Sequence, residues 1–230
     1  MDAALDMLVF GAHPDDAEIG MGGTIYKHTL KGFKVGICDL TYAELSSNGT
    51  VEMRRQEAAE AANILGLSMR SNLGFPDRGL GKTREQIDRI TAEIRKYRPK
   101  IVFAPYWQDR HPDHIACSIL VKEAVFNAKL RRYMPELPAW TVEQTYFYYI
   151  NDLFAPNVIV DVTGQYDIKQ KALAAYRSQF QGEGEDVVAT PLNSGYVQQV
   201  EARDKVLGHK RSVQYAEGFA SELPLMIDTF

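Results

Sequence analysis

The feature that most constrains the fold of this chain is an alternation of short apolar runs with helix-forming stretches over its first 130 or so residues. The apolar runs have the length of strands, and the stretches between them have helical spacing with capping or stop residues at their ends. Four runs have strand character, at 7–11, 34–40, 71–73 and 101–104. Strands that alternate with helices predict a mostly parallel sheet with helices on both faces.

The helical stretches are bounded by residues that commonly begin or end helices. Thr50 and Thr83 are suited to cap a helix start, whereas Gly32, Gly66 and Pro99 follow the ends of helical patterns. The predicted helices are 24–31, 50–65, 83–97 and 113–129.

The last 90 or so residues have a less regular pattern. Strands are predicted at 145–150 and 158–162, helices at 167–180 and 196–208, and a flexible loop at 181–185. No repeat or linker divides the chain. We therefore expect a single domain over residues 1–230, of the α/β class, with a C-terminal elaboration.

Two histidine motifs directly follow the first and the fourth predicted strands. They are His13-Pro14-Asp15-Asp16 and His111-Pro112-Asp113-His114, and they hold three of the five histidines. In a Rossmann-like, doubly wound sheet of strand order 3-2-1-4, strands 1 and 4 are neighbours, and ligands bind at their carboxyl ends. The fold therefore predicts that motifs about 100 residues apart meet in one crevice.

Composition excludes several other functions. The net charge is −4 and the pI is near 5.8, which gives no basic face for nucleic acid. Cys38 and Cys117 form no CxxC pair and lie in apolar stretches, which predicts buried free thiols in a reducing compartment. No signal peptide and no run of about 18 apolar residues is present, so we expect a cytoplasmic protein without a membrane span.

The residue types in the two motifs suit a catalytic divalent metal. Catalytic zinc takes three ligands from His, Asp or Glu, and a metal-bound water has a pKa lowered toward 7. His13, Asp16 and His114 could supply the ligands, and Asp15 could be the general base, although the residues alone leave open which of the two aspartates binds metal. Fe²⁺ and Co²⁺ suit the same ligands.

Other residues near the motifs have candidate roles. His111 could polarise the substrate carbonyl or protonate the leaving group, and Asp113 could orient the His111 ring or only cap a helix. Arg54 and Arg110 could bind an acidic substrate through their planar guanidinium groups. Tyr196 is a further substrate-binding candidate, with weaker support, as is Tyr215.

A nucleotide site is the competing interpretation. Gly20, Gly22 and Gly23 could belong to a phosphate-binding turn, and Asp39 ends the second strand, where dinucleotide folds place a ribose-binding acid. However, the GxGxxG motif is absent, and two carboxylates after the first strand would repel a pyrophosphate. The glycines are better explained by close packing of a helix against a strand.

Taken with Ala12, Glu18 and Gly20, the two motifs resemble the LmbE-like (PIG-L) family of zinc-dependent deacetylases. The resemblance extends to the following residues: Glu44, Gly49, Thr50, Arg54 and Glu57. The stretches 42–50, 109–111 and 215–219 are similar to one branch, the bacillithiol-pathway deacetylases that act on N-acetylglucosaminyl-malate. The stretches around 131–132 and 144–149 match this branch less clearly.

The resemblance implies roles for the site residues. It makes His13, Asp16 and His114 the ligands of Zn²⁺. It makes Asp15 the general base, and it makes His111, assisted by Asp113, the group that stabilises the oxyanion or donates a proton. Arg54 matches a residue that contacts substrate. Members of this branch often form hexamers, so the resemblance also implies a homo-oligomer.

We therefore expect a zinc-dependent hydrolase that removes the acetyl group of an N-acetylglucosamine conjugate, with N-acetylglucosaminyl-malate as the expected substrate. Two alternatives remain open from the sequence. One is an amidase that cleaves a larger thiol S-conjugate with the same metal chemistry. The other is a non-enzymatic nucleotide-binding module on the same fold.

Overall fold

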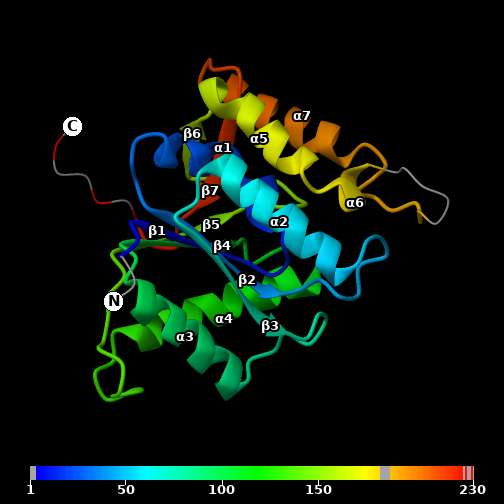
Figure 1. Ribbon diagram of the computed structural model, residues 1–230. Helices are drawn as coiled ribbons and strands as arrows, with labels where there is room; N and C mark the ends of the chain where they lie inside the picture. Colours follow the sequence, from blue (N-terminus) through cyan, green and yellow to red (C-terminus); the bar gives the residue numbers. More distant parts are fainter. Residues whose placement is uncertain (1–3, 182–186, 225, 227–228, 230) are drawn as a thin grey trace.

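A computed structural model of the protein describes residues 4–181, 187–224, 226 and 229. Within these residues seven strands form one sheet in the order β3-β2-β1-β4-β5-β7-β6 (Figure 1). The strands are β1 (Met7–Gly11), β2 (Val35–Thr41), β3 (Met69–Phe75), β4 (Ile101–Pro105), β5 (Gln144–Tyr148), β6 (Val158–Asp161) and β7 (Ala216–Ala220). The strands from β3 to β5 are parallel, which confirms the predicted order 3-2-1-4, whereas β7 is antiparallel to both of its neighbours.

Helices cover both faces of the sheet, so the predicted Rossmann-like, doubly wound α/β fold is confirmed. Two of them, α3 (Arg84–Tyr97) and α4 (Pro112–Ala128), lie on one face (Figure 1). The other face is covered by α1 (Asp16–Thr29), α2 (Val51–Leu65), α5 (Tyr166–Ala174) and α7 (Tyr196–His209). Two short elements, η1 (Thr163–Gln165) and α6 (Arg177–Phe180), flank α5. Each face has its own apolar core.

Local signals fix several helix ends as the sequence predicts. The hydroxyl of Thr50 accepts a hydrogen bond from the amide of Met53 at 3.2 Å and so caps α2. Thr83 caps α3 in the same way. Gly66 ends α2 with φ 66°, a left-handed conformation that glycine adopts without strain.

The predicted start of the first helix was wrong, because α1 begins at Asp16 and not at residue 24. Its glycines therefore lie inside the helix, where they permit close packing. A Cβ at Gly20 would lie 2.1 Å from Cδ2 of Tyr148 on β5, and one at Gly23 would lie 2.8 Å from Cβ of Val162. Gly20 therefore serves helix–strand packing as expected, whereas Gly22 approaches Lys169 on α5 and Gly23 approaches Val162, which follows β6.

The C-terminal part departs further from the prediction. The stretch 167–180 is broken into two helices at Ala175 and Tyr176, and the strand β7 was not predicted. β7 pairs with β5 and β6, so the C-terminal elaboration extends the same sheet. Residues 182–185 of the predicted loop lie outside the described residues.

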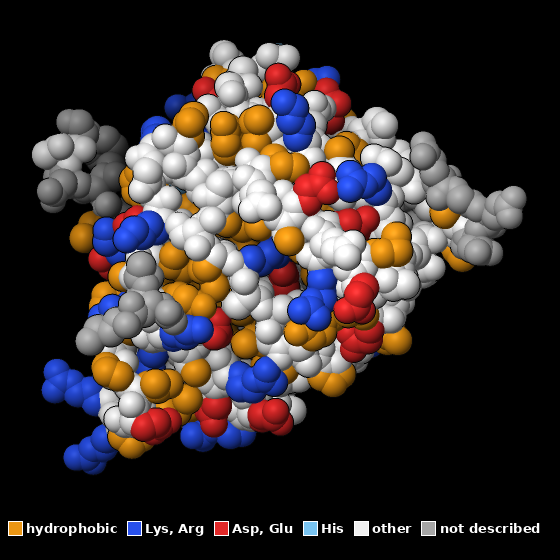
Figure 2. Space-filling view, viewed as in Figure 1, with side chains coloured by type: hydrophobic (Ala, Val, Ile, Leu, Met, Phe, Trp, Pro, Cys, Tyr) orange, Lys and Arg blue, Asp and Glu red, His pale blue; other side chains and the backbone are white. Residues whose placement is uncertain are grey.

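Two further findings concern the chain as a whole. Cys38 and Cys117 are free and buried, as predicted. Among the described helices, none has both the length and the apolar character needed to cross a bilayer. Acidic and basic side chains are interspersed over the face that Figure 2 shows.

Candidate active site

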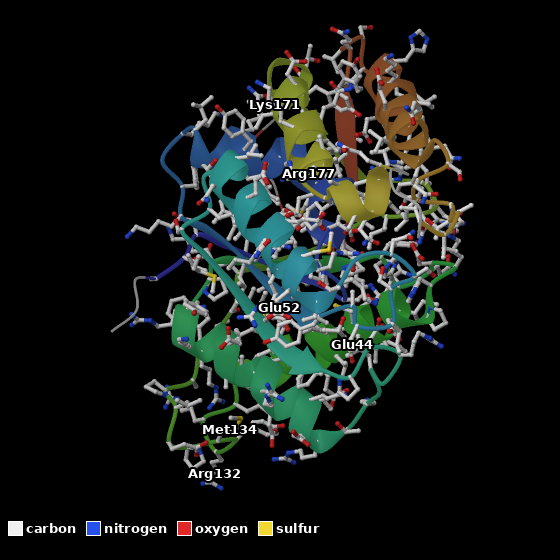
Figure 3. The ribbon with its side chains drawn as sticks, turned by 45° about the vertical axis from the view of Figure 1, so that its right-hand side comes forward. Glu44, Glu52, Arg132, Met134, Lys171 and Arg177 are labelled. Atoms are coloured by element: carbon white, nitrogen blue, oxygen red, sulfur yellow. The ribbon has the colours of Figure 1, made fainter. Side chains whose placement is uncertain are left out.

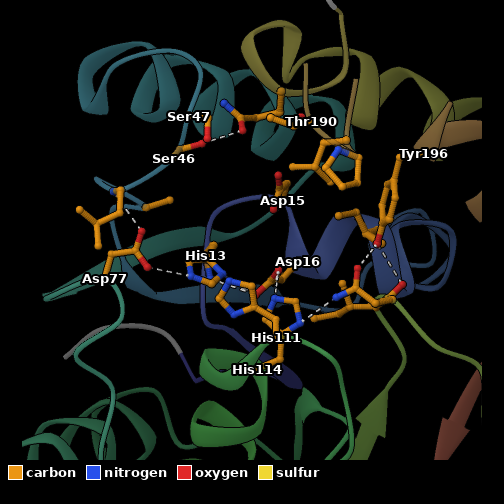
Figure 4. Close-up of a pocket in the computed structure, with 18 of the residues that line it drawn as sticks. His13, Asp15, Asp16, Ser46, Ser47, Asp77, His111, His114, Thr190 and Tyr196 are labelled. Carbon is orange, nitrogen blue, oxygen red and sulfur yellow. Dashed lines mark hydrogen bonds and ion pairs between the residues drawn. The ribbon is translucent and has the colours of Figure 1, made fainter. Parts of the chain in front are cut away.

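The two histidine motifs meet at the carboxyl ends of β1 and β4, as the doubly wound topology predicts. β1 and β4 are paired parallel neighbours. The chain leaves β1 through His13 into α1, and it leaves β4 through a loop that ends at His111, the N-cap of α4. The ring centroids of His13 and His111 are 4.8 Å apart, and those of His13 and His114 are 5.5 Å apart (Figure 4).

These side chains face a cavity of about 340 Å³. Of the catalytic, metal-binding and substrate-binding residues predicted from the sequence, all line it except Asp113 and Tyr215. The cavity is also lined by residues that the sequence did not single out, from the loop after β3, the loop after β5, α6 and the segment before α7. They include Asp77, Asn151, Gln179 and Thr190. A cavity of this size suits a small polar molecule.

Asp16 lies between two imidazoles. Its Oδ1 is 3.1 Å from Nε2 of His114, and its Oδ2 is 3.7 Å from Nδ1 of His13. The ring nitrogens of His13, His111 and His114 also lie within 4.8 Å of one another. Two imidazoles and one carboxylate form the ligand set typical of a catalytic zinc, so the residues present fit a divalent cation.

The electrostatics of this group favour a cation. Burial by itself would lower the pKa of the His13 ring, but hydrogen bonds with three carboxylates outweigh burial and raise this pKa well above its ordinary value. The carboxylates are those of Asp113, Asp16 and Asp77. Burial also opposes protonation of His114, yet Asp16 and Asp109 raise the pKa of its ring to about 9. An environment that stabilises an imidazolium also stabilises a bound metal ion.

Asp15 has a different partner from Asp16. Its backbone has φ 106°, which is rare for a residue with a side chain, and its Oδ2 accepts a hydrogen bond from Nη2 of Arg54 at 2.9 Å. The same Nη2 donates to the carbonyl of Pro14 at 2.6 Å. Burial raises the pKa of the Asp15 carboxyl to about 7, and the Arg54 guanidinium opposes this rise. A carboxylate with such a pKa is suited to take up a proton near neutral pH.

His111 is held as a hydrogen-bond donor toward the cavity. Its Nδ1 accepts the amide hydrogen of Asp113 at 3.2 Å, so the neutral ring carries its proton on Nε2. Burial lowers the pKa of this ring, which favours the neutral form. The Asp113 carboxylate does not orient His111 as predicted, because it binds Arg78 instead. Nor is Asp113 the helix cap, since His111 occupies that position.

Sequence reasoning missed Asp109 and Asn151 behind the second motif. Oδ1 of Asp109 lies 3.0 Å from Nδ1 of His114 and accepts the His111 amide hydrogen at 2.7 Å. Asn151 donates to the same oxygen at 2.8 Å. The position of an acid two residues before His111 was the available signal for Asp109. Asn151 comes from the loop after β5 and has no local signal.

The predicted substrate-binding residues differ in their exposure and in whether their polar groups already have partners. Arg54 is buried against Asp15, and the Tyr196 hydroxyl contacts the carbonyl of Ile150 at 3.2 Å and Oδ1 of Asn151 at 3.0 Å. Arg110 is exposed at the rim, and no hydrogen bond or ion pair to it is found among the described residues. Arg110 is therefore the cation best placed to meet an acidic substrate.

Two other candidates do not belong to the site. Tyr215 stacks on Tyr166, with ring centroids 3.7 Å apart, and does not line the cavity. Asp39 binds Arg70 through both carboxylate oxygens, at 2.8 and 3.0 Å. Its carboxylate is therefore not free to bind a ribose, which argues against the nucleotide-binding alternative.

Comparison with known proteins identifies the family. The sequence matches the family described as PIG-L, GlcNAc-PI de-N-acetylase, over residues 8–125, just over half of the chain. The chain belongs to this family. The matched segment contains both histidine motifs, and PIG-L membership confirms the deacetylase class of hydrolase predicted from the sequence.

Two curated relatives act on N-acetylglucosamine compounds, according to their names. The diacetylchitobiose deacetylase of Thermococcus kodakarensis is 34% identical over 189 residues, which cover 76% of this chain and 70% of the relative. A probable N-acetyl-alpha-D-glucosaminyl L-malate deacetylase 2 of Bacillus cereus is 28% identical over 200 residues, which cover 81% of this chain and 89% of the relative.

Solved structures share the fold. The conserved protein TT1542 from Thermus thermophilus is 43% identical, with a TM-score of 0.89 and 97% of each chain covered. The N,N'-diacetylchitobiose deacetylase from Pyrococcus horikoshii is 28% identical, with a TM-score of 0.81 and coverage of 93% of this chain and 82% of the other. A 4-carboxy-2-hydroxymuconate hydratase from Pseudomonas putida, 22% identical over both complete chains, has a TM-score of 0.80. The fold alone therefore does not determine the reaction.

Proposed function

We propose that this PIG-L deacetylase is zinc-dependent and removes the acetyl group from N-acetylglucosaminyl-malate, an intermediate of bacillithiol biosynthesis. The observation that carries the proposal is one cavity lined by three kinds of groups. These are a ligand set of two imidazoles and one carboxylate, the carboxylate of Asp15 with its raised pKa, and the exposed Arg110 at the rim.

His13, Asp16 and His114 would hold the metal. A bound Zn²⁺ supplies a positive charge that acidifies water and polarises a carbonyl oxygen. The ligand set suits zinc without excluding Fe²⁺ or Co²⁺, so the identity of the metal is itself part of the proposal.

The residues of the chain account for the proton transfers. Asp15 accepts a proton from the water that attacks the acetyl carbonyl, and Arg54 holds its carboxylate in place for that transfer. The Nε2–H of His111 donates a hydrogen bond to the carbonyl oxygen as negative charge develops there. The C–N bond then breaks, and the proton on Asp15 is available to the departing amine. The products are acetate and a free glucosamine amine.

Two observations support malate as part of the substrate: the charge of Arg110 and the similarity to a relative named for a malate conjugate. Malate carries two carboxylates, and Arg110 offers at the cavity rim a guanidinium fork that has no ion pair within the part of the chain that the structure describes. The Bacillus cereus relative supports this assignment through its name, whereas the more similar Thermococcus kodakarensis relative is named for a neutral disaccharide. Substrate choice is therefore the point to test first.

The S-conjugate amidase is the second candidate, because the same chemistry would cleave a larger conjugate if the rim admitted it. The nucleotide-binding alternative is not proposed, since the family is one of deacetylases and the carboxylate of Asp39 is paired with Arg70. A cytoplasmic location, a single functional domain over residues 1–230 and a homo-oligomer such as a hexamer stay predictions.

The deciding experiment is a comparison of substrates on purified protein loaded with zinc. Release of free amine would be measured with N-acetylglucosaminyl-malate, N,N'-diacetylchitobiose and a thiol S-conjugate, each with and without a chelator. We expect the malate conjugate to have the highest kcat/KM and the chelator to abolish turnover. Preference for the disaccharide or the S-conjugate would overturn the proposed substrate, and full activity after complete removal of metal would overturn the metal mechanism.

A further inference from the structure

The loop after β3 reaches the active site although it carries no residue predicted to act there. Oδ1 of Asp77 lies 3.2 Å from Nε2 of His13 (Figure 4). The position of Asp77 is fixed on two sides, because its Oδ2 accepts the Leu45 amide hydrogen at 3.1 Å and its own amide donates to Oε1 of Glu44 at 2.7 Å. Asp77 is thus built into the wall of the cavity beside His13.

The next residue, Arg78, holds a second carboxylate beside the same ring. Its amide donates to Oδ2 of Asp113 at 2.8 Å, and its Nη1 donates to Oδ1 at 2.8 Å. Oδ2 of Asp113 is also 3.5 Å from Nε2 of His13. Arg78 has φ 59°, a strained conformation for a residue with a side chain, which lets consecutive residues reach different partners.

The two nitrogens of His13 therefore face different groups. Nδ1 is directed toward Asp16, whereas Nε2 is directed toward Asp77 and Asp113. A histidine that binds metal through one nitrogen usually donates its other N–H to a carboxylate, and this bond fixes the tautomer and the ring orientation.

We propose that Asp77, Asp113 and Arg78 form a positioning unit for His13. The two carboxylates accept the Nε2–H, which leaves the Nδ1 lone pair directed at the metal position, and Arg78 holds Asp113 in place. Asp113 therefore acts on His13 and not on His111, to which only its backbone amide is bonded. This inference rests on the proposed function, because it takes His13 as a metal ligand.

Metal affinity tests the unit without measuring turnover. The dissociation constant of Zn²⁺ would be measured on the full chain by competition with a chromophoric chelator. We expect Asp77→Asn and Asp113→Asn each to weaken zinc binding by about 10–100-fold, as loss of a carboxylate behind a ligating histidine commonly does. Arg78→Ala should weaken it less than Asp113→Asn, because the Arg78 amide still binds Asp113. Asp88→Asn, on α3 outside the cavity, is the matched control and should bind zinc as the wild type does.

A background variant separates the two roles of Asp113. If Asp113 acts on His13, Asp113→Asn should weaken zinc binding by the same factor in a His111→Ala protein as in the wild type. Disappearance of the effect in that background would assign Asp113 to His111 and overturn the proposal. The metal-free melting temperature of each variant separates positioning from general destabilisation. Affinity losses that merely follow lost stability would also overturn it.

The remaining outcomes are equally decisive. Asp77, Asp113 and His13 also lie within 4.8 Å of one another, so they could hold an ion themselves. Wild-type protein that binds two zinc ions, with Asp77→Asn binding one, would make them a metal site in place of a positioning unit. Unchanged affinity in Asp77→Asn and Asp113→Asn would overturn the inference alone. Absence of zinc binding by the wild type would instead overturn the proposed function.

Discussion

Two groups of buried charges contact α1, one at its first residue, Asp16, and one at the amides of Gly23 and Thr24, and they differ in whether they are closed. In the first, Nζ of Lys169 is 2.6 Å from Oδ2 of Asp204 and 2.7 Å from Oε1 of Glu217, and all three side chains are fully buried. Arg203 binds the other oxygen of Asp204 at 3.1 Å. Each charge there has an opposite partner, and the group does not open onto the catalytic cavity.

The second group, at the active site, is open on one side. Its carboxylates outnumber its guanidinium groups, and the cavity leaves one side free for ligands. The comparison teaches that burial of charge alone does not indicate function. A closed network fixes the fold, whereas an incompletely neutralised one facing a cavity is arranged for a ligand and for proton transfer.

The largest expected loss of turnover is on substitution of Asp15. Asp15→Asn removes the proton acceptor but keeps the shape of the side chain, so kcat should fall by about 10²–10⁴-fold. Zinc content should be unchanged, because Asp15 pairs with Arg54 and not with the imidazoles. Amine release and metal analysis on the same preparation measure both quantities. Near-normal turnover would show that another group is the base.

Substitutions in the closed group should change the stability of the fold and leave the catalytic reaction unchanged. Lys169→Met leaves Asp204 and Glu217 buried without their shared cation, which should lower the free energy of unfolding by about 3–5 kcal/mol. Lys171→Met is the matched control on the same helix, because Lys171 is exposed (Figure 3). Denaturant unfolding compares the two. Equal stability of both variants would show that the Lys169 network does not stabilise the fold.

A smaller effect is expected at Gly20, which lies in α1 between Asp16 of the active site and the Gly23 and Thr24 amides that bind Glu217. Gly20→Ala places a methyl group against the ring of Tyr148, and overpacking of this kind costs about 1–3 kcal/mol of folding free energy. Gly164→Ala, at a position with no atoms within 4 Å of the added Cβ, serves as the control. Thermal and denaturant unfolding of both variants would test this. A Gly20→Ala protein as stable as the control would mean that α1 shifts freely on the sheet.

The smallest effect concerns the open rim of the active site. Arg110→Ala should raise KM for N-acetylglucosaminyl-malate by up to about fivefold, since an exposed ion pair contributes about 1 kcal/mol or less. KM for the uncharged diacetylchitobiose should not change. Arg132→Ala, an exposed arginine in the loop after α4 (Figure 3), is the control. Equal changes with both substrates would exclude recognition of a carboxylate by Arg110.

Much of the fold could be predicted from the sequence because β1 and β4 are continuous apolar runs, β2 is apolar apart from Asp39 and Thr41, and all three are buried along almost their whole length. β7 was missed because its second residue, Glu217, has the character of a surface residue. Its carboxylate is buried only because Lys169 and the amides of Gly23 and Thr24 surround it, from segments 48 or more residues away. Such long-range compensation has no local signature.

In the active site, too, residues with a local sequence signal were predicted and residues placed by long-range contacts were not. His13 and His111 were predictable because each lies in the segment that connects a strand to the next helix, and topology brings β1 and β4 together. Asp77 was not predictable, because it follows β3, whose side chains are mostly half-buried and give a weak strand pattern. Its contact with His13 spans 64 positions of the chain.

The backbone of Asp15 has a consequence for engineering. A side chain at φ 106° costs on the order of 1–3 kcal/mol, and glycine would relieve that cost. Asp15→Gly would nevertheless not stabilise the protein, because it would leave the buried Arg54 guanidinium without its carboxylate, and the loss of a buried partner costs about 3–5 kcal/mol. The Asp15–Arg54 pair therefore holds position 15 in a backbone conformation that its own side chain disfavours, and engineering for thermal tolerance should leave both residues in place.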